Sequence, residues 1–236
     1  MLIIGLTGGI ACGKSSVSER LAKSYKIPVI DADKIAREIV EPQRNAYLKI
    51  VQYFKGKVPD LIREDGSINR PALGKWVFAN HSDLKVLNGI THPAIRLEIF
   101  KQILKQYLRG EKMCVLDVPL LFESGLNLFC GVTVSVICDQ ETQISRIRSR
   151  NPELSLEDGE NRIKAQMTHK ERIRRSDFII ENSDTLEHLY GQVHAFVLKV
   201  KPTWTRTILE YFPPFALISA LAIVLIKYLR RNQAIS

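Results

Sequence analysis

The sequence predicts an α/β protein with a parallel sheet, and three observations support this fold class. Short runs rich in β-branched residues alternate with longer amphipathic stretches, as in sheets whose strands are joined by helices. A glycine-rich turn separates the first apolar run from the first amphipathic stretch. The composition, 45% hydrophobic and 25% charged, allows a packed core in a chain of 236 residues.

The alternating pattern locates the individual elements. Five runs are candidate strands: Leu2–Leu6, Ile27–Ile30, Met113–Leu116, Val132–Ile137 and Phe178–Ile180. Helices are expected to begin near Gly13, Asp33, Asn45, Asn69, Asp83, Pro93, Gln140, Leu156 and Thr185. The gap between the second and third strands is too long for one crossover helix, so we expect an all-helical insertion over about 56–108. A second, strongly basic insertion is expected over about 145–176.

The charge and the cysteines limit the class of partner. A net charge of +9 favours anionic partners, whether nucleotides, nucleic acid or an acidic membrane surface. We expect no nucleic acid, because no helix-turn-helix, zinc-finger or aromatic-stacking signature is present. The four cysteines form no Cys-x-x-Cys pair and no ligand-spaced set with the histidines, which argues against zinc and against a disulfide framework. Cys12 is expected to be a small side chain that fits the turn, with an oxidisable thiol as the alternative.

The glycine-rich turn has the pattern of a phosphate-binding loop. Residues Gly8–Ser15 match G-x-x-x-x-G-K-[ST], and the motif has the strand before it and the helix after it that it requires. Glycines let successive N–H groups turn inward on a phosphate, and the helix adds its positive dipole end. Lys14 can reach the β- and γ-phosphates, and the hydroxyl of Ser15 can bind Mg²⁺. The expected nucleotide-binding residues are Gly8, Gly9, Ile10, Ala11, Cys12, Gly13, Lys14 and Ser15.

The second candidate strand favours a kinase over other nucleotide-binding proteins. It ends in Asp31-Ala32-Asp33, and carboxylates at the carboxyl end of a parallel strand face the ligand crevice. One of them can orient an acceptor hydroxyl and take its proton. We expect Asp33 to be this base. Asp31 is expected either to cap the next helix or to contact the ligands of Mg²⁺ without binding the ion itself. The guanine-specifying N-K-x-D pattern is absent, which argues against a G-protein.

Five motifs follow one another along the chain: GLTGGIACGKS, VIDADKIAREIVEP, ITHPAIR, VLDVPLLFESGL and RIKAQMTHKERIRRSDFIIEN. With them the sequence resembles the dephospho-CoA kinase family over about residues 2–199. The resemblance implies a P-loop NTPase fold, a three-layer α/β/α arrangement around a five-stranded parallel sheet, with a helical acceptor-binding insertion and a lid. It implies that ATP, with Mg²⁺, phosphorylates the ribose 3′-hydroxyl of dephospho-CoA in the last step of coenzyme A synthesis.

The resemblance also assigns roles to single residues. Gly8–Ser15 would bind the ATP phosphates, and Asp33 would be the general base. His92, in Thr-His-Pro, would shape the acceptor site, although it could equally be a simple helix-start residue. Asp117 ends the third strand, where an aspartate can hold the metal, but some members of the family lack an acid there.

The segment after the third strand is expected to form part of the acceptor pocket. Leu120 and Leu121 would line it and Glu123 would lie at its rim, together with Asp31 on the acceptor side. A rigid turn with packed leucines is the alternative.

The basic insertion is expected to form the lid over ATP. Arg146 and Arg150 fall one helical turn apart, so both can face the nucleotide. We expect Arg146 to stabilise the transferred charge, with Lys14 and Asp33 as the other catalytic residues, and Arg150 to support it. For most of the other arginines here we expect a solvated face: Arg148, Arg172, Arg174 and Arg175.

The composition shifts after Arg206, so we expect a kinase domain over 1–206 and a hydrophobic tail over 207–236. The stretch from Tyr211 to Ile226 carries no charge, and it predicts a membrane-spanning helix from about Pro213. Tyr211 and Tyr228 would be interfacial anchors, and Lys227, Arg230 and Arg231 supply positive charge at the far end. A helix docked on the core is the alternative. A similar tail is found in fungal members of the resembled family.

The expected location is a membrane with the catalytic domain facing the cytosol, either the mitochondrial outer membrane or the endoplasmic reticulum. The expected partners are dephospho-CoA, ATP, the membrane and other enzymes of coenzyme A biosynthesis. Two other functions stay open: a P-loop kinase for another small acceptor such as a nucleoside or nucleotide, and a nucleotide-binding membrane scaffold for coenzyme A enzymes that has lost catalysis.

Overall fold

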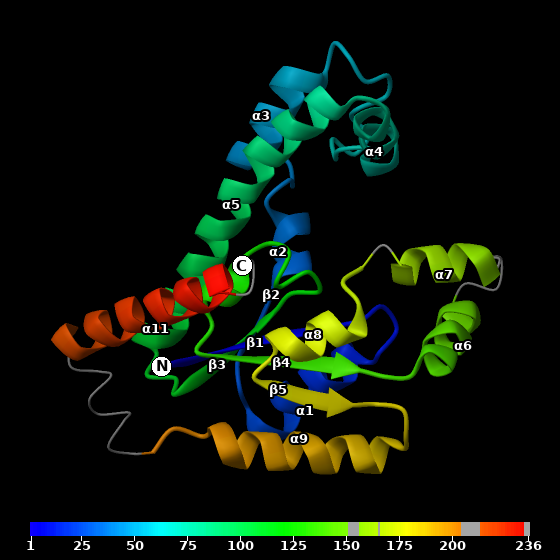
Figure 1. The fold of residues 1–236 in the computed structure, drawn as a ribbon. Helices are drawn as coiled ribbons and strands as arrows, with labels where there is room; N and C mark the ends of the chain where they lie inside the picture. Colours follow the sequence, from blue (N-terminus) through cyan, green and yellow to red (C-terminus); the bar gives the residue numbers. More distant parts are fainter. Residues whose placement is uncertain (151–155, 165, 204–212, 234–236) are drawn as a thin grey trace. The chain divides into compact units, whose positions relative to one another are not determined.

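The computed structural model describes residues 1–150, 156–164, 166–203 and 213–233 (Figure 1). Its sheet has five strands in the order β2-β3-β1-β4-β5. The strands are β1 Leu2–Gly8, β2 Val29–Asp31, β3 Met113–Asp117, β4 Val132–Ile137 and β5 Phe178–Glu181. All five predicted strands and the α/β class are therefore confirmed. β2 begins later than expected, after Pro28, which has no N–H to donate to a strand ladder.

The parallel register brings the ends of the strands together. β1 pairs in parallel with β3 and with β4, and β4 pairs in parallel with β5. Leu6 lies opposite Asp117, and Gly8 lies opposite Val136. Because these strands run in the same direction, their carboxyl ends meet at one edge of the sheet. The glycine-rich loop, Asp117 and the residues after β4 therefore lie along the same edge.

One face of the sheet is covered by helices α1 Lys14–Tyr25 and α9 Leu186–Val200. Each helix places apolar residues four positions apart, on the stripe that faces a core. Val17 and Leu21 of α1 share one buried cluster with Val193 and Val197 of α9 and with Ile4 of the sheet. This packing fixes where α1 begins, and with it the loop that precedes α1.

The opposite face is covered by the chain that follows β3. Side chains alternate across a strand, so Gly5 faces away from the side taken by Ile4. A Cβ at Gly5 would lie 2.8 Å from Leu121 Cδ2 and 2.7 Å from Cys130 Sγ. This segment contains the 3-10 helix η1 Leu126–Phe129, and helix α8 His169–Arg175 packs beside β4 (Figure 1).

Residues 31–105 form a second compact unit, and residues 1–30 with 106–236 form the first. The second unit contains α2 Ala32–Glu38, α3 Asn45–Phe54, α4 Arg70–Ala79 and most of α5 His81–Leu108. Its core includes Ile50, Phe54 and Leu73. One isolated antiparallel bridge, Ile62 with Ile68, departs from the all-helical expectation for this segment.

Helix α5 corrects the prediction of separate helices at Asp83 and Pro93. Pro93 lies inside α5, which runs without a break through both positions. A proline in a helix interior removes one main-chain bond at about 3 kcal/mol, which the tertiary packing must offset. The hydroxyl of Thr91 donates to the Leu87 carbonyl at 2.9 Å, as in a continuous helix. The Asp83 carboxylate lies inside the fold, where Tyr53 and Trp76 donate to it at 3.0 and 2.7 Å.

The basic insertion contains α6 Gln140–Arg150, α7 Leu156–Lys164 and α8. The starts of α6 and α7 agree with the predictions, whereas α8 was not predicted. Thr168 caps α8 by accepting the N–H of Glu171. The T-x-x-E pattern of a capping box was therefore present in the sequence as a start signal for this helix.

Helix α11 Pro213–Gln233 begins at the expected residue, but the expected membrane span is not found. Within the described ranges no helix is both long enough and apolar enough to cross a membrane. The uncharged part of α11, from Pro213 to Ile226, covers only about 21 Å of a hydrocarbon core of about 30 Å. Tyr211, the expected first anchor, lies outside the described residues.

Candidate active site

At two positions of the loop Gly8–Ser15, the backbone leaves room for glycine only. A side chain at Gly8 would lie 2.9 Å from the carbonyl oxygen of Val136. Gly13 has a φ of +87°, and a Cβ there would lie 2.1 Å from Asn182 Nδ2. Left-handed backbone and close approach both select glycine. The loop therefore turns tightly into the amino end of α1, where main-chain N–H groups can bind an anion.

Three amide side chains hold this loop in shape. Asn182 Nδ2 donates to the Cys12 carbonyl at 2.9 Å, and Gln143 Nε2 donates to the Ile10 carbonyl at 2.8 Å. The N–H of Ile10 donates to Gln166 Oε1 at 2.9 Å. These side chains come from the ends of β5, from α6 and from the segment before α8. The basic insertion thus braces the phosphate loop as well as supplying charge, and no local sequence pattern indicates these contacts.

Lys14 and Asp117 form an ion pair at the edge of the sheet. The Lys14 side chain is 19% exposed and that of Asp117 is 5% exposed, so the pair is largely shielded from solvent. Phosphate oxygens can take the place of the carboxylate beside the ammonium, which leaves Asp117 near the same phosphates. The structure therefore brings together two of the residues that the sequence singled out.

Side chains around the loop also bury polar atoms that have no hydrogen-bond partner. Those atoms are Gln143 Oε1, Arg146 Nη1, His169 Nε2, and Nε and Nη2 of Arg172. His169 Nε2 lies 3.6 Å from the position of a Cβ on Gly9. The three arginine nitrogens are donors without an acceptor, so they fit an anion supplied by a ligand, whereas Gln143 Oε1 is an acceptor. Nucleotide phosphates are anions of this kind.

Arg172 corrects the expectation of a solvated face, which holds for the exposed Arg148, Arg174 and Arg175. Its side chain is 0% exposed, and its Nη1 donates to Thr7 Oγ1 at 3.3 Å. Neither Arg172 nor His169 is among the predicted site residues. They lie three positions apart on α8 and so share one face of the helix, which was the available signal.

Burial lowers the pKa values of two basic side chains in this cluster. It lowers the pKa of Arg172, and the charge of Glu123 partly opposes this effect. It also lowers the pKa of His169, with a further lowering from the charge of Arg172. His169 is therefore predominantly neutral at pH 7, with one nitrogen able to accept.

Cys12 is buried in the loop, which agrees with the expectation of a small side chain that fits the turn. Its Sγ lies 3.2 Å from Sγ of Cys138, which donates to it. This hydrogen bond is the main cause that lowers the pKa of Cys12, whereas the same contact raises the pKa of Cys138. Both thiols are free.

The second unit contains three predicted acceptor-side residues. Asp31 Oδ1 accepts the N–H groups of Asp33 and Lys34 at 2.9 and 3.0 Å, so Asp31 caps α2. Asp33 is exposed in the first turn of α2. His92 is exposed in the interior of α5, so it is not a helix-start residue.

The segment after β3 contains the remaining acceptor-side candidates. Leu120 is 46% exposed, whereas Leu121 is fully buried against Gly5. Glu123 is exposed, as is Arg150 at the last position of α6. Leu121 is therefore a core residue, as in the packed-turn alternative, and Leu120 is free to contact a ligand.

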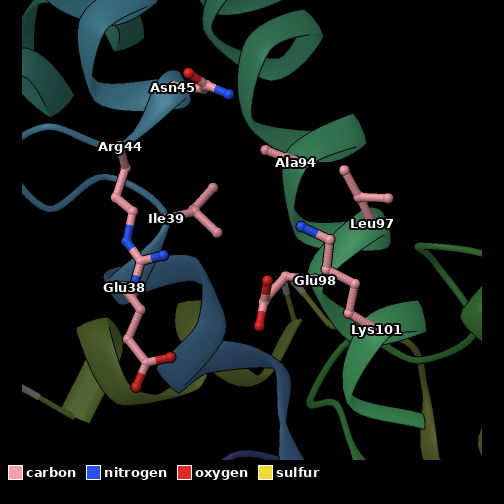
Figure 2. Close-up of a pocket in the computed structure, with 8 residues that line it drawn as sticks. All are labelled: Glu38, Ile39, Arg44, Asn45, Ala94, Leu97, Glu98 and Lys101. Carbon is pink, nitrogen blue, oxygen red and sulfur yellow. The ribbon is translucent and has the colours of Figure 1, made fainter. Parts of the chain in front are cut away.

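A separate depression lies within the second unit (Figure 2). It has a volume of about 150 Å³ and is lined by Glu38, Ile39, Arg44, Asn45, Ala94, Leu97, Glu98 and Lys101. Two acidic and two basic side chains surround it, and both basic ones are exposed. With no buried, unpartnered polar atom among these lining residues, we assign it no ligand.

Comparison with known proteins agrees with this geometry. Residues 2–188 match the family model of dephospho-CoA kinase. The dephospho-CoA kinase CAB5 of Saccharomyces cerevisiae is 59% identical over 98% of this chain and 96% of its own length. The dephospho-CoA kinase of Oceanobacillus iheyensis is 44% identical over 84% of this chain and 97% of its own.

A solved structure agrees in fold as well as in sequence. The dephospho-CoA kinase of Campylobacter jejuni has a TM-score of 0.64 and 32% identity, covering 84% of this chain and 96% of its own. From the loop, the sheet and these matches together, the chain belongs to the dephospho-CoA kinase family.

Proposed function

We propose that this chain transfers the terminal phosphoryl group of ATP to the ribose 3′-hydroxyl of dephospho-CoA, which gives coenzyme A. The observation that carries the proposal is the braced phosphate loop with the Lys14–Asp117 pair beside it, in a member of this kinase family. ATP is the substrate that suits a P-loop kinase. The acceptor follows from the family to which the chain belongs.

The nucleotide site is assigned to the loop and the lid. Main-chain N–H groups of Gly8–Ser15 would bind the phosphates at the amino end of α1. The ammonium of Lys14 would pair with the β- and γ-phosphates, and Arg146 on α6 would stabilise the charge of the transferred group. The buried, unpartnered Nη1 of Arg146 supports this role.

The metal is assigned to Ser15 and Asp117. Mg²⁺ is usually held by one or two carboxylates, water and substrate phosphates. A hydroxyl and a carboxylate near the phosphate loop are suitable hard donors, and the described residues contain no cluster of three or more acidic, His or Cys ligands. These donors fit Mg²⁺ that arrives with ATP, and the bound ion would neutralise charge on the β- and γ-phosphates.

Asp33 is assigned as the general base. As the hydroxyl oxygen of the acceptor bonds to the γ-phosphorus, its proton passes to the Asp33 carboxylate. The bond from phosphorus to the bridging oxygen breaks, and its electron pair stays on ADP. The exposed carboxylate, free of the capping role that Asp31 performs, supports this choice. His92, Leu120 and Glu123 are assigned to acceptor binding, with Asp31 and the buried Leu121 as supports within their own segments.

An acceptor panel tests the proposal. Purified protein receives ATP and, separately, dephospho-CoA, a nucleoside and a nucleoside monophosphate, and the products are identified by mass spectrometry. We expect phosphorylation of dephospho-CoA alone, and we expect Asp33→Asn to keep ATP affinity while losing at least about 100-fold in turnover. The control is Asp60→Asn, an exposed acid of the same unit. Preference for another acceptor, or ATP binding without any turnover, would contradict the proposal.

For the C-terminal segment we propose attachment to a membrane surface, with the kinase facing the cytosol on the mitochondrial outer membrane or the endoplasmic reticulum. Ile218, Leu221 and Leu225 of α11 are 62%, 70% and 58% exposed, and basic residues follow them in the sequence. A helix of this kind can lie in the membrane interface, where other coenzyme A enzymes could gather. Deletion of residues 207–236 should release the protein from the membrane fraction and preserve turnover. Membrane association that survives the deletion would refute the attachment.

A further inference from the structure

The guanidinium of Arg172 is buried without a full set of hydrogen bonds, which is energetically unfavourable. It is 0% exposed, and the hydrogen bond from Nη1 to Thr7 Oγ1 is long at 3.3 Å. Among the residues that the structure describes, Nε and Nη2 have no hydrogen-bond partner. A buried charge without full pairing destabilises a protein, and an apolar side chain of similar size would fill the same space without that penalty. The packing of the fold therefore does not explain why this residue is an arginine.

The position of Arg172 suggests what the charge is for. Thr7, which it contacts, immediately precedes the phosphate loop and also donates to the Pro119 carbonyl at 2.7 Å. Arg172 is also a secondary cause of the lowered pKa of Cys12, after the hydrogen bond from Cys138, and of the lowered pKa of His169, after burial. The unpartnered nitrogens therefore belong to a buried side chain that is anchored at the residue before the phosphate loop.

The helix that carries Arg172 is fixed to the sheet. Ser176 Oγ donates to the Arg172 carbonyl at 2.8 Å and lies 2.6 Å from Ser135 Oγ of β4. A donor that is held in place before the ligand arrives needs no reorganisation during the reaction, which is the condition for strong electrostatic stabilisation.

We propose that Arg172 is a catalytic residue that binds the terminal phosphoryl group of ATP through Nε and Nη2. This inference rests on the proposed kinase activity. A guanidinium can bind two phosphate oxygens with parallel N–H groups, which an ammonium cannot do. Arg172 exchanges no atom in the reaction. Its N–H groups stabilise the charge on the equatorial oxygens while the acceptor oxygen bonds to phosphorus and the bond to ADP breaks.

The test compares Arg172→Met, Arg172→Lys and the control Arg174→Met. Methionine is unbranched and apolar, so it fills most of the buried space without charge. Arg174 lies on the same helix, is exposed and pairs with Glu171, so its replacement leaves the loop untouched. We expect Arg172→Met to lose about 100- to 1,000-fold in turnover, the size typical of one lost transition-state donor. Arg172→Lys should recover part of this loss, and Arg174→Met should stay within about twofold of the wild type.

Thermal unfolding separates a catalytic role from a structural one. Without nucleotide, Arg172→Met should unfold at the wild-type temperature or above it, because an unpaired buried charge has been removed. A non-hydrolysable ATP analogue should raise the unfolding temperature of the wild type more than ADP does, and Arg172→Met should lose this difference. If Arg172→Met unfolds at a clearly lower temperature yet still distinguishes the analogue from ADP, Arg172 is structural and the proposal is wrong.

The comparison of the ATP analogue with ADP tests the role of Arg172 independently of which acceptor the enzyme uses. A wild-type protein that fails to phosphorylate dephospho-CoA would overturn the proposed function. The comparison of ATP analogue with ADP needs no acceptor, so it still decides whether Arg172 binds the terminal phosphoryl group. Equal discrimination by the wild type and by Arg172→Met would overturn the inference even if coenzyme A is formed.

Discussion

Substitutions at Gly13 and Asn182 should have coupled effects on the stability of the protein, because the two residues are in contact in the phosphate loop. The Asn182 side chain occupies the place of a Cβ on Gly13, at 2.1 Å, and donates to the Cys12 carbonyl at 2.9 Å. Gly13→Ala must therefore expel Asn182 and break its hydrogen bond. Asn182→Ala breaks the same bond without a clash. Both substitutions remove the same hydrogen bond, so their effects on the free energy of unfolding should not add.

The magnitude follows from the contacts. Asn182→Ala leaves a buried carbonyl unsatisfied, at about 2 kcal/mol. Gly13→Ala incurs the same loss and adds about 1 kcal/mol for a side chain at a φ of +87°, about 3 kcal/mol in all. The double variant loses the bond only once, so we expect about 3 kcal/mol again and a coupling of about 2 kcal/mol.

The assay is urea unfolding of the wild type, both single variants and the double variant. The control is Gly110→Ala, because Gly110 has a φ of +80° and no atom within 4 Å of its missing Cβ. It should lose about 1 kcal/mol from the left-handed backbone alone, and this loss should add to that of Asn182→Ala. A double variant of Gly13 and Asn182 that loses about 5 kcal/mol, the sum of the single effects, would refute the reasoning.

Three further predictions follow from the site and its supports. Lys14→Ala should lose both ATP binding, measured by calorimetry, and turnover, measured by product formation. The control Lys23→Ala, at an exposed lysine, should change neither. Unchanged ATP binding in Lys14→Ala would contradict the assignment of the phosphate loop. Hydrogen bonds from the N–H and hydroxyl of Thr142 lower the pKa of Asp139 to about 2, so its contribution to stability is present above about pH 4 and lost as the pH falls toward 2. Acid unfolding of Asp139→Asn should therefore depend less on pH in that window, and an unchanged profile would contradict the assignment. Leu121→Ala should lower the free energy of unfolding by about 2–5 kcal/mol, as for a core leucine, and a loss below about 1 kcal/mol would show that Leu121 is not packed.

The features that could be predicted from the sequence have local signals. The five strands are short apolar runs, and the phosphate loop is a contiguous pattern from Gly8 to Ser15. The capping role of Asp31 was one of two alternatives, because an aspartate before a helix is a common cap. These predictions needed only neighbours along the chain.

The features that could not be predicted depend on contacts between distant segments. Gln143 and Asn182 bind loop residues that are 133 and 170 positions away, and nothing in their own neighbourhood indicates this. Arg172 has basic neighbours, which favour a solvated face, and only the packing of α8 buries it. The expected membrane span is not supported, since no helix of the described ranges is both long enough and apolar enough to cross a membrane.

The most direct test of the whole account is a crystal structure with a non-hydrolysable ATP analogue and dephospho-CoA bound together. We predict that the triphosphate lies in the loop Gly8–Ser15, with the ribose 3′-hydroxyl within about 3.2 Å of the Asp33 carboxylate. A triphosphate bound elsewhere, or a 3′-hydroxyl beyond the reach of Asp33, would contradict the account.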